Sequence, residues 1–589
     1  MKTAQNNLAC KLVYSSYAEK RNSVWCSAII SKVSHFFFGR VNGLPNPNKI
    51  INFFDRSILF RVLGLAIYLI FVWSMAYIKK DYIWFPGDAA NLLQQSILMS
   101  KGFLPNVDFF SGYPGLDIQI NATILSLMES SLASQHVYMA LSASALGLFF
   151  FLSFDRVEPW LITLSLLFIY SQGLYPNPAP NPGYLFIVFF VIGLKKTIDY
   201  FYGYSFFDSI LAGFFFSLAF LSKQYGIFGP VCFFIATMGF LNCHPKFQKK
   251  IFLLVLATVS SLFIVFYAHA LWGNVSKHRE ILLNTLVFSI PFFSASIIYF
   301  KSPGQYAMST LSFRRALQAN ILLVVTFLAT TVFYLIYLYG FDALPEVLNK
   351  FLIQAPRRIN QNIYPVSFSV SSTAIIFLGL IFFTLPFVFN SDRVGKFNSI
   401  WHFCNFVILC LSLFFIFRFE SLHMTVFVVF AYIAAIIMVS YNNHAKHRKV
   451  LLAVISGFSP CFVLLIPWPN PAYHIPILVF FVLIALQLFR ENTKSSAIST
   501  RMNTTAYLTM SIFVYCLLTI YPHNTVNRNL VNWSFGNLNF TSGDKSWSNS
   551  INEANLVMQE AGICSSYGCR FLVFSTQWKR DYLEVIEKP

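Results

Sequence analysis

Apolar stretches of about 20 residues recur along almost the whole chain, each long enough to cross the roughly 30 Å hydrocarbon core of a bilayer as a helix. The first runs from Ile58 to Ile78. A bilayer core offers no water to satisfy backbone polar groups, so such a chain folds as a bundle of spanning helices. Of the 589 residues, 56% are hydrophobic and only 11% are charged, which excludes a soluble enzyme and a disordered protein.

These stretches predict an all-α polytopic integral membrane protein with about 13 to 15 transmembrane helices. The first span is too long, and lies too deep in the chain, to be a cleaved signal peptide. We expect residues 1–57 to form a basic cytoplasmic segment, residues 58–521 the membrane domain and residues 522–589 an extracytoplasmic cap. After the first span, the expected spans are 136–154, 160–175, 183–198, 207–222, 225–241, 251–271, 281–300, 317–340, 368–389, 401–417, 424–440, 450–466, 475–489 and 505–521.

The net charge of +19 reflects membrane topology rather than a nucleic-acid partner. Lys and Arg residues stand mostly in short polar gaps between apolar stretches, not on one polar face. With the N terminus inside, the inner segments collect more of the 42 Lys and Arg residues than the outer ones, as the positive-inside rule requires. This topology places the loop 79–135, the turn at Lys223 and the loop 341–366 outside.

Cysteine spacing argues against a structural zinc site, because the chain has no Cys-x-x-Cys pair. Cys564 and Cys569 are close neighbours in the polar C-terminal segment, and their spacing allows a small disulfide in an oxidising compartment. Whether they form one is left open by the sequence.

The first outer loop, 79–135, is rich in acidic residues. A membrane protein has little structural need for carboxylates in such a loop, so their concentration there points to a function. Asp88 begins a predicted helix that carries Leu92, Ser96 and Met99 on one side, so the helix can lie at the membrane interface.

Turns between Gly102 and Gly115 reverse the chain before a second amphipathic stretch from Leu116 to Leu132. The acids of the loop are thereby expected at one membrane face, with Asp117 and Glu129 solvated or interfacial.

Three runs in this loop form a recognisable pattern: Gly87-Asp88-Ala89-Ala90, then Gly102-x-x-Pro105-x-x-Asp108, then Tyr113-Pro114-Gly115. The pattern resembles the first outer loop of GT-C superfamily glycosyltransferases, polytopic enzymes that use polyprenyl-phosphate sugars. Further elements of bacterial members resemble Asn181-Pro182-Gly183-Tyr184, Leu221-Ser222-Lys223-Gln224 and Arg418-x-Glu420-x-x-His423. The likeness covers residues 56–440 in order and spacing. Many relatives, including protein mannosyltransferases, carry an adjacent Asp-Glu pair where this chain has Gly87-Asp88, so the donor class and any dependence on a divalent cation stay open.

The chemistry of sugar transfer assigns roles to these residues. A carboxylate near the interface can accept the proton that an acceptor hydroxyl loses, and Asp88 is the candidate base, with Asp108 as a second catalytic candidate. Outward-facing cations can stabilise the departing lipid phosphate. The candidates for phosphate binding are Lys223, Arg357, Arg358, Arg418 and His423. The resemblance implies inversion of the anomeric configuration and no certain cofactor, and no metal ligands are assigned.

Each candidate also has a structural alternative. Asp88 can act only as a helix cap, and Asp108 can bond the backbone of its own turn. Lys223 can extend to the lipid headgroups, as lysines at span ends often do. Arg357 and Arg358 can bind anionic lipid without discrimination, and Arg418 and His423 can pair with Glu420.

The sequence therefore predicts a membrane glycosyltransferase that moves a sugar from a polyprenyl-phosphate donor to a hydroxyl of a lipid-linked glycan, a lipid or a protein. The reaction is expected at the extracytoplasmic face of a bacterial inner membrane. One alternative is a polymerase or ligase of lipid-linked glycans, with its essential residues in the late loop 341–366. Another is a transporter or flippase, which predicts ionisable residues in the middle of spans, and this chain has few.

Overall fold

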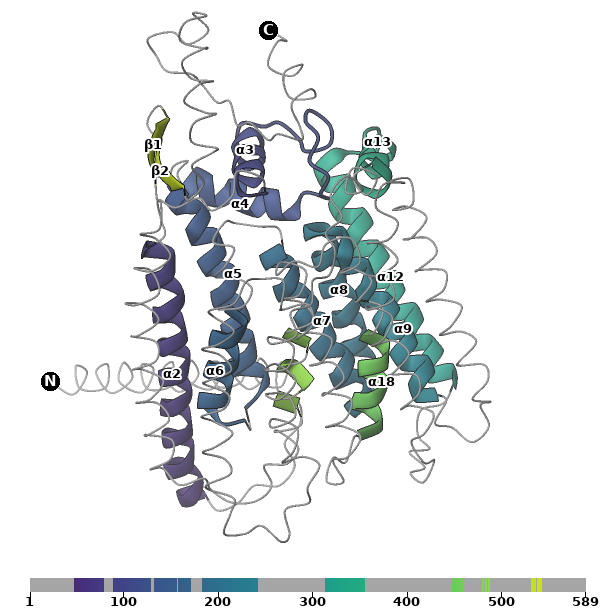
Figure 1. Ribbon diagram of the computed structural model, residues 1–589. Helices are drawn as coiled ribbons and strands as arrows, with labels where there is room; N and C mark the ends of the chain where they lie inside the picture. Colours follow the sequence, from purple (N-terminus) through teal and green to yellow (C-terminus); the bar gives the residue numbers. More distant parts are fainter. Residues whose placement is uncertain are drawn as a thin grey trace, which may run out of the picture.

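The part of the chain that the computed structural model describes is a bundle of helices with a few shorter elements at one end (Figure 1). The described residues are 47–78, 88–128, 132–155, 157–170, 183–241, 313–354, 448–458, 461, 479–480, 482–484, 486–487, 531–535 and 538–542.

Eight helices make up the bundle within these residues. They are α2 (Pro47–Ile78), α5 (Leu132–Ser153), α6 (Pro159–Ile169), α7 (Gly183–Gly203), α8 (Phe206–Ser222), α9 (Phe228–Leu241), α12 (Phe313–Tyr339) and α18 (Arg448–Phe458). Among the described helices, Ile58–Ile78, Ser134–Ser153 and Arg314–Tyr339 are long and apolar enough to cross a membrane. The protein is therefore helical and carries apolar helices of spanning length. The expected number of 13 to 15 spans stays a prediction, because many of those spans lie outside the described residues.

Helix α2 has one exposed apolar face and one face that packs against the bundle. It begins at Pro47, earlier than the expected boundary at residue 58, and proline is well suited to the first turn of a helix. Leu59 is largely exposed while Tyr68 is fully buried against α5. The Tyr68 hydroxyl donates to the carbonyl oxygen of Ala143 at 3.1 Å. A Cβ at Gly147 would lie 2.4 Å from the Tyr68 ring, so glycine permits this close contact between helices.

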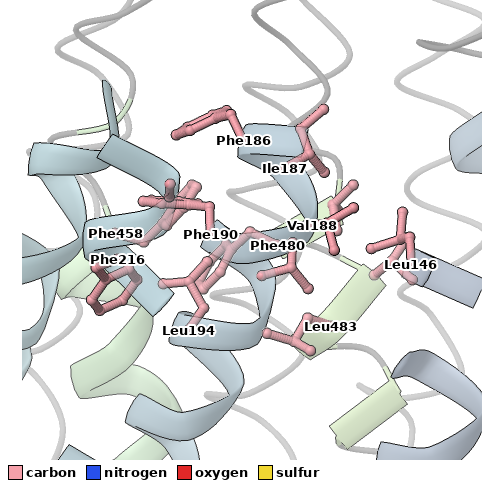
Figure 2. Close-up of a cluster of buried hydrophobic side chains, with 14 of the residues drawn as sticks. Leu146, Phe186, Ile187, Val188, Phe190, Leu194, Phe216, Phe458, Phe480 and Leu483 are labelled. Atoms are coloured by element: carbon pink, nitrogen blue, oxygen red, sulfur yellow. The ribbon is translucent and has the colours of Figure 1, made fainter. Parts of the chain in front are cut away.

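The centre of the bundle is the contact of α7 with α8 and of α8 with α12. A Cβ at Gly213 in α8 would lie 2.4 Å from the carbonyl oxygen of Leu323 in α12, so these two backbones approach closely. Buried aromatic rings fill the space toward α18. Phe190, Phe216 and Phe458 pack together from three helices, as Figure 2 shows. This apolar core forms a rigid support for the two ends of the bundle.

One end of the bundle holds an arginine cap and partly buried ion pairs. Arg61 of α2 donates hydrogen bonds of 3.0 Å to the carbonyl oxygens of Phe151 and Phe154, which satisfies the C-terminal end of α5. Lys196 of α7 lies 3.2 Å from the carboxylate of Asp208 in α8. The loops near these residues are the ones that the charge pattern predicts to be inside.

The opposite end holds the short elements α3 (Asp88–Ser100), α4 (Leu116–Met128), η2 (Gln224–Ile227), α13 (Leu344–Asn349) and η4 (Lys350–Gln354). Figure 1 shows α3, α4 and α13 together at this end. The segments that the topology assigns to one side of the membrane thus do share one end. Which end faces outward stays a prediction.

A β-hairpin is the described part of the C-terminal segment and departs from the all-α expectation. Strands β1 (Val531–Phe535) and β2 (Leu538–Ser542) pair antiparallel, with Trp533 opposite Phe540. Gly536 and Asn537 stand between them in the sequence, a pair typical of a two-residue hairpin loop. The assignment of residues 522–589 as a cap stays a prediction.

Candidate functional site

Helices α3 and α4 of the first loop are joined to α5 by buried amide groups. Helix α3 begins at Asp88, as the sequence predicts, and its Leu92 and Ser96 face the interior. The Asn121 amide of α4 donates to Ser96 Oγ and to Gln135 Oε1, each at 2.9 Å. Gln135 of α5 returns a bond of 3.1 Å to Asn121 Oδ1. Buried hydrogen-bonded amides fix relative orientation, so α3 and α4 form a defined platform.

The loop between α3 and α4 is closed by one side chain, that of Asn106. Its backbone is left-handed, with φ 61°, a conformation that Asn tolerates better than most residues. Asn106 Oδ1 accepts bonds of 3.2 Å from the backbone amides of Ser111 and Gly112. Its Nδ2 donates to the carbonyl oxygen of Tyr113 at 2.6 Å. The turns expected between Gly102 and Gly115 are thus held by an internal hydrogen-bond network.

This loop is also tied to distant parts of the chain. The Tyr339 hydroxyl of α12 donates to the carbonyl oxygen of Pro114 at 2.7 Å. Gln224, directly after Lys223, donates its side-chain amide to the carbonyl oxygen of Gly112 and, at 3.2 Å, to that of Phe351 in η4. Three segments that are remote in sequence therefore meet at one point at this end of the bundle.

The two candidate catalytic acids differ in their placement. Asp88 is the first residue of α3, at the start of the platform. Asp108 is exposed, and its Oδ2 accepts a hydrogen bond of 2.6 Å from the backbone amide of Leu104. This bond supports the structural alternative for Asp108, in which the carboxylate stabilises its own turn.

The expectation that Asp117 is solvated or interfacial is wrong, because Asp117 is 0% exposed. It stands in the first turn of α4, and neither carboxylate oxygen accepts a hydrogen bond from a side chain of the described residues. Burial raises the pKa of Asp117 to about 7. The backbone amides of Ile118 and Asp117 and the ammonium group of Lys223 oppose this rise.

Lys223 is buried as well, with 4% of its surface exposed, which argues against extension to the headgroups. It stands in extended conformation between α8 and η2, and its Nζ lies 5.4 Å from the centre of the Tyr225 ring. Tyr138 of α5 and Tyr334 and Tyr339 of α12 also interact electrostatically with Asp117. A buried acid, a buried cation and tyrosines thus meet beneath the first loop.

No sequence signal marks Asp117 as buried. Its nearest partners in α12 are more than two hundred residues away, and an Asp in the first turn of an amphipathic helix is ordinarily solvated.

The remaining phosphate-binding candidates, Arg357, Arg358, Arg418 and His423, lie outside the described residues, as does Glu129. Within the described residues, no group of three or more His, Cys, Asp or Glu side chains is arranged to hold a metal ion.

Comparison with known proteins leaves the family open. No protein-family model and no curated protein matches the chain. Among solved structures, it is similar to the archaeal oligosaccharyltransferase AglB from Archaeoglobus fulgidus, solved in complex with an inhibitory peptide and a dolichol-phosphate. The identity is 12% and the TM-score 0.29, and the match covers 78% of this chain and 54% of AglB. The chain thus spans about half the length of AglB, and a similarity at this level assigns no function.

Proposed function

We propose that the chain is a membrane glycosyltransferase that moves a sugar from a polyprenyl-phosphate donor to an acceptor hydroxyl. The observation that carries the proposal is the hydrogen bond from Gln224 to Gly112. It joins the Lys223-Gln224 element to the first-loop pattern, two parts of the sequence that separately resemble GT-C glycosyltransferases. A shared site explains why both elements occur in one chain.

The proposed base is Asp88, which removes the proton of the acceptor hydroxyl as that oxygen attacks the anomeric carbon. Its position at the start of α3, on a platform held by the Asn121 and Gln135 amides, suits a group that has to be oriented accurately. Asp108 is the weaker candidate, because its carboxylate is already bonded to the turn that contains it.

The proposed stabiliser of the departing phosphate is Lys223. As the bond between the anomeric carbon and the phosphate oxygen breaks, negative charge develops on the lipid phosphate. A buried ammonium group interacts with that charge more strongly than an exposed one, because the surrounding dielectric constant is low. Arg357, Arg358, Arg418 and His423 remain proposed partners in the same role. The first two follow η4 closely in sequence, and Gln224 holds η4 through Phe351.

The structure bears on both alternatives. The segment 344–354 lies at the same end as α3 and α4, so a lipid-linked glycan polymerase that relies on Arg357 is separated from our proposal only by mutagenesis. A transporter predicts ionisable groups in mid-span. The described charged residues of α7 and α8, namely Lys195, Lys196, Asp199 and Asp208, instead pair with one another.

The test is mass spectrometry of envelope glycolipids and glycans from cells that lack the protein. Complementing genes encode the original sequence, Asp88→Asn or Arg357→Gln, at matched expression. We expect cells that lack the protein to make a product one sugar short. The original sequence should restore the complete product, and Asp88→Asn should not, because Asn keeps the capping ability but removes the base.

Glu346→Gln is the matched control, because Glu346 is an acid at the same end whose side chain is 65% exposed. It should restore the product fully. Equal restoration by Asp88→Asn would overturn the role of Asp88, and loss only with Arg357→Gln would favour the polymerase.

A further inference from the structure

Two buried polar groups beneath the first loop have no hydrogen bond from another side chain among the described residues. They are the carboxylate of Asp117 in α4 and the hydroxyl of Tyr138 in α5. The two groups interact electrostatically, and Lys223 interacts with the same carboxylate. A buried polar group without a partner costs free energy, so such groups point to a place where another polar group can bind.

We propose that Asp117, Tyr138 and Lys223 form a buried subsite for the donor phosphate, in which protonated Asp117 and the Tyr138 hydroxyl donate hydrogen bonds and Lys223 supplies positive charge. This inference rests on the proposed function and extends it, since it adds two residues to the phosphate site and makes donor binding dependent on pH. It concerns Asp117 and Tyr138 as binding residues, whereas Asp88 keeps the role of base.

The hydrogen-bond donors of the subsite favour a phosphate as its occupant. Phosphate oxygens only accept hydrogen bonds, and an ammonium, a phenol and a carboxylic acid all donate. An ionised Asp117 would instead repel the phosphate. Because its pKa is about 7, Asp117 is protonated part of the time at neutral pH, and the Asp117–Lys223 pair then keeps net positive charge. A bound anion favours the protonated form further.

The titratable groups that face Asp117 come from three parts of the bundle. They are Tyr138 from α5, Tyr334 and Tyr339 from α12, and Lys223 between α8 and η2. The described side chains of α3, residues 92–100, include no titratable group.

Two of these tyrosines already have partners. Tyr334 donates to Gln119 and Tyr339 donates to Pro114, each at 2.7 Å. In the proposed subsite, the change of charge near neutral pH is assigned to Asp117, whose pKa is about 7.

The proposal fixes the direction in which phosphate binding changes with pH. Binding requires protonated Asp117, so affinity is constant well below about pH 7 and falls as the pH rises above it, by up to about tenfold per pH unit. In Asp117→Asn the amide donates at every pH, so the affinity should not vary. Tyr138→Phe removes one donor, so affinity should fall several-fold at every pH while its pH dependence is kept.

The experiment measures binding of methyl farnesyl phosphate to the purified full-length protein in detergent by isothermal titration calorimetry, from about pH 6 to about pH 9. This prenyl phosphodiester carries one negative charge throughout that range, so the ligand adds no titration of its own. We expect the original protein to lose about tenfold in affinity between about pH 7.5 and about pH 8.5, and Asp117→Asn to lose none. Glu346→Gln serves as the control and should keep the original profile.

The outcomes separate the two proposals. The subsite is overturned if binding to the original protein shows no pH dependence and Tyr138→Phe binds as well as the original protein. If Lys223→Met nevertheless abolishes binding, the proposed function stays intact. If the original protein binds no prenyl phosphodiester at any pH, both proposals are overturned. Should Asp117→Asn fail to fold, the pH profiles of the original protein and of Tyr138→Phe still decide.

Discussion

The hydroxyl of Tyr339, the last residue of α12, donates a 2.7 Å hydrogen bond to the carbonyl oxygen of Pro114 in the first loop. Five residues earlier in the same helix, Tyr334 donates to Gln119 Oε1 at the same distance. A long apolar helix thus holds both the turn before α4 and α4 itself. The position of the candidate site therefore depends on a helix that carries none of the candidate catalytic residues.

Removing the hydrogen bond from Tyr339 to Pro114 should make the first loop less firmly held. We expect Tyr339→Phe to lower kcat/KM for sugar transfer about fivefold and to reduce stability by about 1 kcal/mol, the usual net value of one hydrogen bond. Tyr337→Phe is the matched control, because Tyr337 belongs to the same helix and is 71% exposed. Transfer assays and thermal unfolding in detergent measure both effects, and equal behaviour of the two variants would contradict the role of Tyr339.

Gly115 should tolerate no side chain. Its φ of +116° is unfavourable for other residues, and an added Cβ would lie 2.8 Å from the Tyr339 hydroxyl. Gly102 has a φ of +93° but nothing within 4 Å of an added Cβ. Gly102→Ala should therefore cost only backbone strain, about 1–3 kcal/mol, whereas Gly115→Ala should cost more and impair transfer. Comparable unfolding temperatures for the two variants would refute the close approach of α12.

Asp117 should make the protein less stable as the pH rises. Its pKa is about 7 in the folded protein against an ordinary value of 3.8, so the folded state retains a proton that the unfolded state loses. Stability therefore falls between about pH 4 and about pH 7, and Asp117→Asn should gain up to about 4 kcal/mol near pH 8. Thermal unfolding of both proteins across this range checks the sign. A stabilisation that is the same at about pH 4 and at about pH 8 would show that Asp117 does not titrate in this way.

The packing of α9 against α18 can be tested through two thiols. Cys232 and Cys461 are buried, and their sulfur atoms lie 3.6 Å apart. A membrane-permeant oxidant such as diamide should couple them, and mass spectrometry after digestion should find the linked peptides. Cys232→Ser should give no such product. Recovery of both thiols in free form after oxidation would contradict this placement.

The sequence predicted the local features of the site well. The start of α3 at Asp88, the turns before Gly115 and the start of α4 at Leu116 follow from capping residues, glycines and prolines, which act over a few residues. The charge pattern correctly grouped the first loop, Lys223 and the segment after α12 at one end of the bundle.

The buried Asp117 was not predictable by the same reasoning. Its burial depends on Tyr138, Tyr334 and Tyr339, and contacts between distant helices leave no periodic signal in a single sequence. Asp108 shows the reverse case. A role in its own turn was one of two interpretations, and the bond from Leu104 supports that one.

The central claim is that the protein transfers a sugar and releases a polyprenyl phosphate. The most direct measurement incubates the purified protein with polyprenyl lipids and acceptors extracted from membranes of cells that lack it. Mass spectrometry then follows free polyprenyl phosphate and any acceptor that gains one sugar. We predict that the original protein produces both in equal amounts and that Asp88→Asn produces neither. Absence of both products with the original protein, or equal release by Asp88→Asn, would contradict the account.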